Sequence, residues 1–267
     1  MFNLISKIVK FIELDGENFK DKVLVWKSKI ILIIFKFFSF FFSFGELHLG
    51  RFLNKDVIAK NSYGKFYCRK KDEDLTIISE IVEPKTLEIF KRLAKNSKLV
   101  IDVGSHIGKY TILAGKISKK VISFEPQKYN FEILKKNIKL NNLKNVIALN
   151  FGVFNKNKRL KLYKSNTSGR YSIKIKDKEY EVVNCVRLDI ILNKFKINEV
   201  DLIKIDVEGA EKEALLSLGY YLKKRKIRNI IIEILPQNLR WIKKFIENCG
   251  YSIENIEKNN YLISVCK

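Results

Sequence analysis

A short apolar run that stops at a glycine constrains the fold of this chain more than any other feature. Residues 99–114 read LVIDVGSHIGKYTILA, and residues 99–103 have the composition of a strand buried on both faces of a parallel sheet. Gly104 follows at once, and a helical pattern begins near Ile107. A strand, a glycine turn and a helix in this order begin a β-α-β unit, so the chain is predicted to have an α/β fold.

The glycine turn also indicates a ligand site. The spacing Asp102-x-Gly104-x-x-x-Gly108 differs from the GxGxxG pattern of dinucleotide-binding proteins, but the physical basis is related. Gly104 allows a tight turn and a close approach to a ligand, and the next helix offers free N–H groups to an anion. The side chains at this turn are therefore candidate ligand contacts: Asp102, Ser105, His106, Tyr110 and Thr111.

A carboxylate at the end of the next predicted strand strengthens this interpretation. The run 121–126 reads VISFEP, and Glu125 lies 23 residues after Asp102. An acid in this position can accept hydrogen bonds from both hydroxyls of a ribose, and an exposed strand-end glutamate is the alternative. A third strand, residues 146–150, ends where an adenine would lie, so Asn150 is a weaker candidate.

A further buried strand ends in a dense acidic turn. Residues 200–211 read VDLIKIDVEGAE, which places Asp206, Glu208 and Glu211 between a strand and a helix. Lys204 lies two residues before Asp206 and thus on the same face of that strand. These acids could supply a general base or, less favourably, oxygen ligands for a divalent cation. No metal site is predicted, because the chain has only two histidines and its four cysteines lack CxxC spacing.

Taken together, these motifs resemble the FkbM family of methyltransferases. The segments IDVGSHIGKYT, FEP, Leu188–Asp189 and IKIDVEGAE occur in that order with fitting intervals, and the resemblance covers residues 99–234. It implies an α/β class I methyltransferase fold of Rossmann-like type, with a seven-stranded, mainly parallel sheet. The sequence adds a C-terminal antiparallel hairpin and a hydrophobic N-terminal helical appendage to that fold. One departure is His106, which stands where the family usually has asparagine.

The resemblance implies S-adenosylmethionine as the cofactor and a hydroxyl oxygen as the methyl acceptor. Residues of the glycine turn and of the neighbouring strand ends would bind the cofactor: Asp102, Gly104, Ser105, His106, Gly108, Tyr110, Thr111, Glu125, Pro126, Asn150 and Asp206. The candidate catalytic residues are three acids at or after strand ends: Asp206, Glu208 and Glu233. A Gly104→Arg substitution is expected to abolish cofactor binding without unfolding the domain.

The favoured function is S-adenosylmethionine-dependent methyl transfer to a hydroxyl of a saccharide, a glycolipid or another small molecule. The excess of 52 Lys and Arg over 29 Asp and Glu raises the alternative of an RNA methyltransferase. Nucleic acid is the less favoured partner, because the lysines are spread along the chain and the Asn/Asp-Pro-Pro-Tyr motif of base methylation is missing. A catalytically degenerate interaction subunit is the third alternative.

The N-terminal part carries a phenylalanine-rich apolar stretch. Residues 30–44 read IILIIFKFFSFFFSF, which is shorter than the roughly 20 apolar residues that span a membrane. Three interpretations stay open: a membrane-surface helix with contact through residues 23–49, a helix buried against the catalytic domain or a partner subunit, and a membrane span. We expect a cytoplasmic protein, with association to the cytoplasmic face of a membrane and oligomerisation left open.

The chain is expected to divide into a hydrophobic and basic N-terminal helical segment, a lead-in hairpin with a helix, and the methyltransferase domain, at residues 1–54, 55–98 and 99–267. The lead-in hairpin turns near residues 61–64, and its helix begins at Pro84. The C-terminal hairpin is expected to turn at Lys258–Asn260.

Overall fold

The computed structural model describes residues 13–39, 49–164, 171–172 and 179–266, and the chain divides into two compact units. The first unit comprises residues Met1–Pro84 with Lys139–Asn142, and the second comprises Lys85–Ile138 with Leu143–Lys267. The lead-in segment expected at residues 55–98 is therefore divided at Pro84. Its hairpin packs with the N-terminal helix, whereas its own helix contacts the helix at residues 109–117 of the second unit through the Phe90 and Tyr110 rings, 4.8 Å apart.

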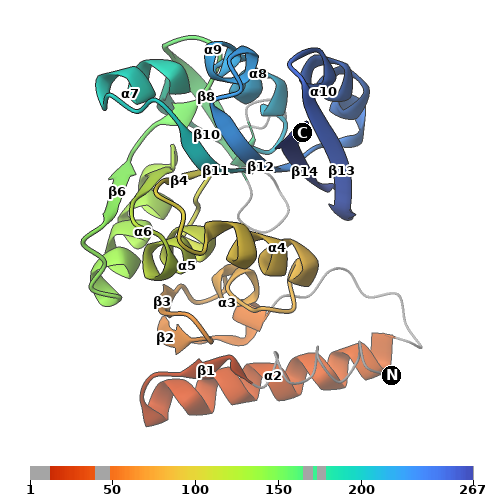
Figure 1. The fold of residues 1–267 in the computed structure, drawn as a ribbon. Helices are drawn as coiled ribbons and strands as arrows, with labels where there is room; N and C mark the ends of the chain where they lie inside the picture. The colour runs from red at the N-terminus through yellow and green to blue at the C-terminus, as the bar shows by residue number, and fades with distance from the viewer. Residues whose placement is uncertain (1–12, 40–48, 165–170, 173–178, 267) are drawn as a thin grey trace. The chain divides into compact units, whose positions relative to one another are not determined.

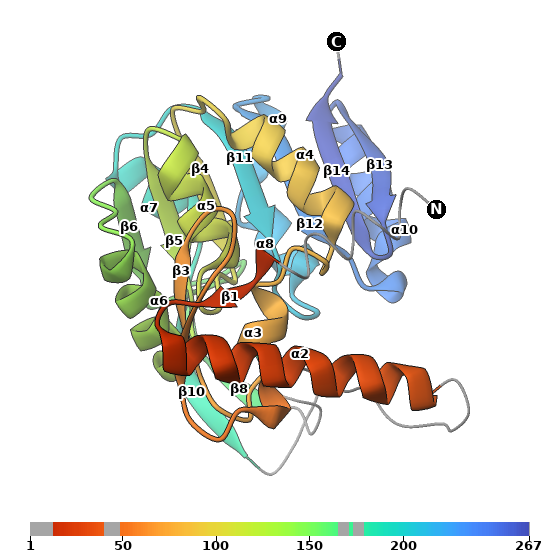
Figure 2. The same ribbon diagram turned by 90° about the horizontal axis from the view of Figure 1, so that it is seen from below.

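A seven-stranded sheet forms the core of the second unit. Its strands are β4 (Val100–Val103), β5 (Val121–Phe124), β6 (Val146–Leu149), β11 (Val200–Ile205), β12 (Ile227–Glu233), β13 (Tyr251–Glu257) and β14 (Asn260–Val265). The order is β13-β14-β12-β11-β4-β5-β6 (Figures 1 and 2). The five strands from β12 to β6 are parallel, and β14 and β13 are antiparallel to their neighbours, as the sequence predicts.

Helices cover both faces of this sheet. Figure 1 shows α4, α5 and α6 on one face and α7 to α10 on the other. Both β4 and β5 are buried at every position, which explains why their residues are apolar except for Asp102 and Ser123. The helices are α4 (Pro84–Ala94), α5 (Lys109–Ile117), α6 (Lys128–Leu140), α7 (Leu188–Lys194), α8 (Glu211–Leu216), α9 (Gly219–Lys223) and α10 (Pro236–Asn248).

The expected turn of the C-terminal hairpin needs a correction. Lys258 adopts a left-handed φ of 48° and makes the turn with Asn259, whereas Asn260 already belongs to β14. Asn260 is 1% exposed and pairs with Glu233 at the end of β12. Asparagine is common in turns, so the sequence indicated a turn at Asn260. In the structure, the Asn260 side chain is buried in the protein interior.

A smaller, four-stranded sheet follows β6 in the chain. It has the order β7-β10-β8-β9, and β10 pairs antiparallel with β8. Its strands are β7 (Gly152–Val153), β8 (Lys158–Lys164), β9 (Tyr171–Ser172) and β10 (Tyr180–Val186).

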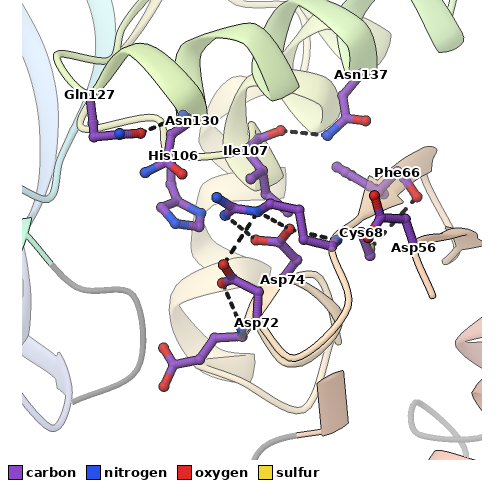
Figure 3. A network of polar contacts seen from close by, with 12 residues as sticks. Asp56, Phe66, Cys68, Asp72, Asp74, His106, Ile107, Gln127, Asn130 and Asn137 are labelled. Carbon is purple, nitrogen blue, oxygen red and sulfur yellow. Dashed lines mark hydrogen bonds and ion pairs between the residues drawn. The ribbon is translucent and has the colours of Figure 1, made fainter. Parts of the chain in front are cut away.

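The first unit combines a helix with a small antiparallel sheet. Its elements are β1 (Asp15–Gly16), α2 (Phe19–Ser39), the 3-10 helix η1 (Leu49–Phe52), β2 (Val57–Lys60), β3 (Lys65–Cys68) and α3 (Asp74–Ile77). Strands β2 and β3 form the predicted hairpin, which the Asn61 N–H closes on the Gly64 carbonyl at 3.0 Å. After β3, the Arg69 guanidinium binds the fully buried Asp74 carboxylate through Nε at 2.7 Å and Nη2 at 2.6 Å (Figure 3).

Part of the phenylalanine-rich stretch belongs to α2. Residues 30–39 form the C-terminal half of this helix, and residues 40–48 lie outside the described part of the chain. In the described ranges, no helix combines the length and the apolar character needed to cross a membrane.

Candidate functional site

The glycine turn and the acidic turn meet at the carboxyl edge of the large sheet. Strands β4 and β11 are neighbours, with Asp102 opposite Lys204, and the Asp206 N–H donates to the Val103 carbonyl at 2.9 Å. Gly104 has a φ of +82°, and a Cβ atom at this position would lie 1.7 Å from the Asp206 carbonyl oxygen. The two turns therefore pack backbone against backbone, and motifs about a hundred residues apart in sequence form one site.

This contact corrects the expectation for Gly104→Arg. Residue 104 must be glycine for two reasons that do not involve a ligand. The Asp206 backbone leaves no space for a Cβ atom, and the φ of residue 104 lies in the left-handed region. Any side chain at residue 104 would force the two strand ends apart. Loss of cofactor binding in Gly104→Arg would therefore accompany loss of folding stability, and this variant does not isolate ligand binding.

The carboxylate of Glu125 is fixed at the same edge by two backbone amides. Its Oε2 atom accepts the His106 N–H at 2.8 Å, and its Oε1 atom accepts the Gln127 N–H at 2.9 Å. A carboxylate has about four lone-pair positions, so it can accept more than two hydrogen bonds. Glu125 is thus buried and oriented, rather than the exposed strand-end glutamate of the alternative interpretation.

The backbone of His106 explains why the family's asparagine can be replaced here. His106 has a φ of 50°, in the left-handed region where asparagine, aspartate and histidine are all enriched among non-glycine residues. The contact that it makes with Glu125 uses its N–H group. The position therefore needs a residue that tolerates this conformation, and the bond to Glu125 does not depend on the side chain.

Three other candidates around the turn have polar or aromatic groups engaged inside the protein. The Ser105 hydroxyl lies 3.0 Å from the Asp102 carbonyl and 3.2 Å from the Phe124 carbonyl. The Thr111 hydroxyl donates to Asp102 Oδ2 at 2.5 Å, and the Tyr110 ring packs on Phe90. These side chains shape the turn, so its candidate ligand-binding groups are backbone amides and the buried Glu125 carboxylate.

Polar contacts also fix the chain that follows β5. The Asn150 side-chain amide donates to the Glu125 carbonyl at 2.8 Å and to the Pro126 carbonyl at 3.0 Å. The Gln127 side-chain oxygen accepts the Asn130 N–H at 2.6 Å (Figure 3). Asn150 thus ties the end of β6 to the end of β5, and Gln127 fixes the start of α6. Gln127 was not among the sequence candidates, because its role depends on the folded position of Glu125.

Asp102 is a buried acid with an unusual proton affinity. Burial raises its pKa from 3.8 to about 6, although the Thr111 hydroxyl and the Lys204 ammonium favour the ionised form. The raised pKa means that the folded protein binds a proton more tightly than the unfolded chain does. Between about pH 4 and pH 6, this group therefore makes the folded state less stable as the pH rises.

An Asp102→Asn variant is expected to lose this pH dependence. The difference in unfolding free energy between wild type and variant should shift by about 2 kcal/mol between pH 4 and pH 7, and the wild type should be the less favoured of the two at the higher pH. Urea unfolding of both proteins across this range measures the difference and cancels the other titrating groups. Parallel stability curves would show that Asp102 has an ordinary pKa in the folded protein.

A buried lysine links the acidic turn to the end of the sheet. Lys204 is fully buried, and its Nζ atom lies 3.5 Å from Asp206 Oδ2 and 3.5 Å from Asn260 Oδ1. The same Nζ atom lies 5.3 Å from the centroid of the Tyr110 ring. Asn260 was missed by the sequence analysis, because it lies 56 residues from Lys204. Lys204 and Asn260 therefore lie on the same side of the site as Asp206.

The candidate catalytic acids have different surroundings. The Asp206 side chain is 32% exposed, so it can meet a ligand while its backbone is held against Gly104. Glu208 is half-buried and adopts a φ of 45°, a strained conformation of the kind that clusters at functional sites. Glu233 is half-buried at the end of β12, opposite Asn260. The three acids thus follow the ends of two adjacent strands.

Glu211 has a structural role. One of its carboxylate oxygens accepts the Gly209 N–H at 2.7 Å, and the other accepts the side-chain amide of Asn238 on α10. The residue is 1% exposed in the first turn of α8, so it holds the acidic turn in shape. Among the residues that the structure describes, no three side chains of His, Cys, Asp or Glu are grouped as a metal site requires.

Comparisons with known proteins identify the family. The model of the methyltransferase FkbM domain matches residues 102–253, which is more than half of the chain. The methyltransferase sdnD of Sordaria araneosa is 25% identical over 225 residues, which cover 70% of this chain and 86% of that protein.

Solved structures of methyltransferases are more distant. The methyltransferase FkbM from Methylobacillus flagellatus KT has 16% identity and a TM-score of 0.46, over 63% of this chain and 43% of that longer chain. The M. jannaschii TYW2 in complex with AdoMet has 18% identity and a TM-score of 0.39, over 79% of this chain and 84% of that one. On the domain match, which contains the glycine turn, Glu125 and the acidic turn, the chain belongs to the FkbM family of S-adenosylmethionine-dependent methyltransferases.

Proposed function

We propose that this protein transfers the methyl group of S-adenosylmethionine to a hydroxyl oxygen of a saccharide, a glycolipid or another small molecule. One observation carries the proposal. A carboxylate oriented by two amides, Glu125, and a partly exposed carboxylate, Asp206, flank the same glycine turn at the carboxyl edge of the sheet. Glu125 can accept hydrogen bonds from the ribose of the cofactor, and Asp206 can accept the proton that the acceptor must lose.

The residues present fit S-adenosylmethionine. A carboxylate in the place of Glu125 suits the two ribose hydroxyls, and the amides at the start of α5 suit the carboxylate of the methionine part. Residue Gly108 precedes this helix and makes no side-chain cap, whereas the Asp102 carboxylate accepts a backbone hydrogen bond from Thr111 in the first turn of α5. When bound, the cofactor supplies a strongly electrophilic methyl group on a sulfonium sulfur.

The chain then has to align an acceptor and receive its proton. Alignment of the attacking oxygen with the methyl group is a large part of catalysis for such an electrophile. Asp206 is the preferred general base, and Lys204 holds its carboxylate from the buried side at 3.5 Å. Glu208 and Glu233 are the next candidates for proton transfer or for hydrogen bonding to the acceptor.

The proposal is tested with cofactor that carries a labelled methyl group. The purified protein is incubated with monosaccharides, glycolipids, small phenols and RNA, and the products are analysed by mass spectrometry after alkaline and acid treatment. An ether-linked methyl group on a hydroxyl acceptor supports the proposal. Methyl transfer to RNA bases would show that the protein is an RNA methyltransferase and would contradict the proposal. Cofactor binding without transfer to any class of acceptor would favour an interaction subunit.

A Glu125→Gln variant is expected to bind S-adenosylhomocysteine roughly 10- to 100-fold more weakly, because a glutamine side chain has one acceptor oxygen instead of two. Titration calorimetry measures the affinity. The matched control is Glu132→Gln on the exposed side of α6, where the carboxylate pairs with Lys135 at 3.0 Å and the affinity should not change. Equal affinities in both variants and the wild type would remove Glu125 from the cofactor site.

A further inference from the structure

Five apolar side chains project from α2 into solvent. Their exposed fractions lie between 43% and 81%, and they are Phe19, Val23, Trp26, Ile30 and Ile33, hereafter the apolar stripe. The intervals of four and three residues place all five along one line on the helix. Val25 and Ser28 lie on another side and are fully buried, so α2 packs on the first unit with one face and exposes an apolar line with another.

Lysines border this stripe on both sides. At 100° per residue, Lys20 and Lys27 lie along one edge of the stripe and Lys22 lies along the other, and all three are exposed. Lys22 has a distant partner in Asp15, 3.8 Å away, and this long, partly exposed ion pair contributes little to stability. The exposed side of the helix therefore combines apolar groups with positive charge.

The one acid of α2 is directed away from this side. Asp21 is 5% exposed, its Oδ2 atom accepts the Ile58 N–H at 3.1 Å, and its Oδ1 atom lies 3.4 Å from Lys55 Nζ. Asp21 therefore interacts with groups of the first unit, and its negative charge does not offset the positive charge of the lysines along the stripe.

The charge pattern distinguishes between possible occupants of the stripe. The same spacing could form the seam of a coiled coil with a second copy of the chain, in which Lys20, Lys22 and Lys27 would flank the seam. Lysine would then face lysine in either orientation of the two helices, which is repulsive. An anionic bilayer surface offers the opposite charge to every one of these lysines and an apolar layer beneath it.

We propose that the apolar stripe of α2 binds the surface of an anionic lipid membrane. The helix lies parallel to the bilayer, the stripe enters the boundary between headgroups and acyl chains, and the lysines extend to the lipid phosphates. This is narrower than the contact through residues 23–49 expected from the sequence, because it uses only side chains from Phe19 to Ile33. The inference is independent of which hydroxyl the protein methylates.

The chain offers a direct test, because Trp26 and Trp241 are its two tryptophans. In a Trp241→Phe variant, the fluorescence reports only on the stripe. With vesicles of phosphatidylcholine and phosphatidylglycerol, we expect the emission of Trp26 to shift to shorter wavelength and to be quenched by lipids brominated on the acyl chains. In the Trp26→Phe variant, Trp241, which stacks on Phe245 at 5.0 Å, should show neither effect.

A charge variant tests the role of the lysines. Replacing Lys20, Lys22 and Lys27 together by glutamine should weaken binding at least tenfold, since each lysine near an anionic surface contributes roughly fivefold in affinity. The control replaces three exposed lysines of the second unit, Lys135, Lys243 and Lys244, by glutamine, which changes the net charge equally and should leave binding within about twofold of wild type. Far-UV circular dichroism verifies that both variants are folded.

Three outcomes would overturn the proposal. The first is an unchanged Trp26 emission on anionic vesicles. The second is equal binding of the two triple variants, which would indicate attraction by the net charge of the chain alone. The third is a Trp26 shift that depends on protein concentration without vesicles, together with a dimer in sedimentation, which would assign the stripe to a second copy of the chain.

Discussion

Replacing Asp206 by asparagine is expected to lower kcat for methyl transfer roughly 100- to 10,000-fold, because a positioned general base contributes that much to proton transfer. Asparagine has nearly the same shape, and the backbone contacts of residue 206 with Val103 and Gly104 do not involve the side chain. The affinity for S-adenosylhomocysteine should therefore fall by less than roughly tenfold, the equivalent of one ordinary hydrogen bond. Initial rates at saturating acceptor, measured across pH, separate the two effects.

A Glu233→Gln variant is the comparison for this experiment. Glu233 ends the adjacent strand and lies opposite Asn260, so it tests the neighbouring carboxylate at the same edge of the sheet. If Asp206 is the base, its variant loses the pH-dependent rise of kcat, whereas Glu233→Gln keeps it. A full rate in Asp206→Asn with a large loss in Glu233→Gln would transfer the role to Glu233.

The architecture of the second unit could be predicted because its physical constraints are local. A parallel strand covered by helices on both faces is mostly apolar on both faces, and residues 99–103 and 121–124 show this in the sequence, with Asp102 and Ser123 as the exceptions. The division of the chain at Pro84 could not be predicted in this way. It depends on which surfaces the lead-in hairpin and α4 bury, and their partners are distant in sequence.

The sequence predicted which backbone segments meet at the candidate site better than it predicted the directions of their side chains. The glycine turn, Glu125 and the acidic turn follow strand ends, and parallel strands bring their ends to one edge of the sheet. The inward direction of Ser105 and Thr111 depends on acceptors that appear only after folding. The contact of Lys204 with Asn260 likewise joins two strands whose adjacency the residue pattern does not specify.

The same dependence on distant backbone makes Gly104→Ala the most damaging small substitution we expect. A left-handed conformation costs a residue with a Cβ atom about 1–3 kcal/mol. The added atom would also lie 1.7 Å from the Asp206 carbonyl oxygen, a backbone atom that cannot rotate away as a side chain could. We expect a loss of at least about 3 kcal/mol in unfolding free energy and a fall in Tm of roughly 10 °C, measured by thermal unfolding.

Gly219→Ala is the matched control, because it adds the same methyl group without these two conflicts. Gly219 begins α9, and a Cβ atom there meets nothing within 4 Å. Alanine reduces the conformational entropy of the unfolded chain, so this variant should be more stable by about 0.4–1 kcal/mol. If the Tm of Gly104→Ala equalled that of the wild type, the two turns would not be in close backbone contact. If it lost stability as expected and still bound S-adenosylhomocysteine when folded at low temperature, Gly104 would be required for joining the strand ends, with ligand contacts made by the neighbouring amides.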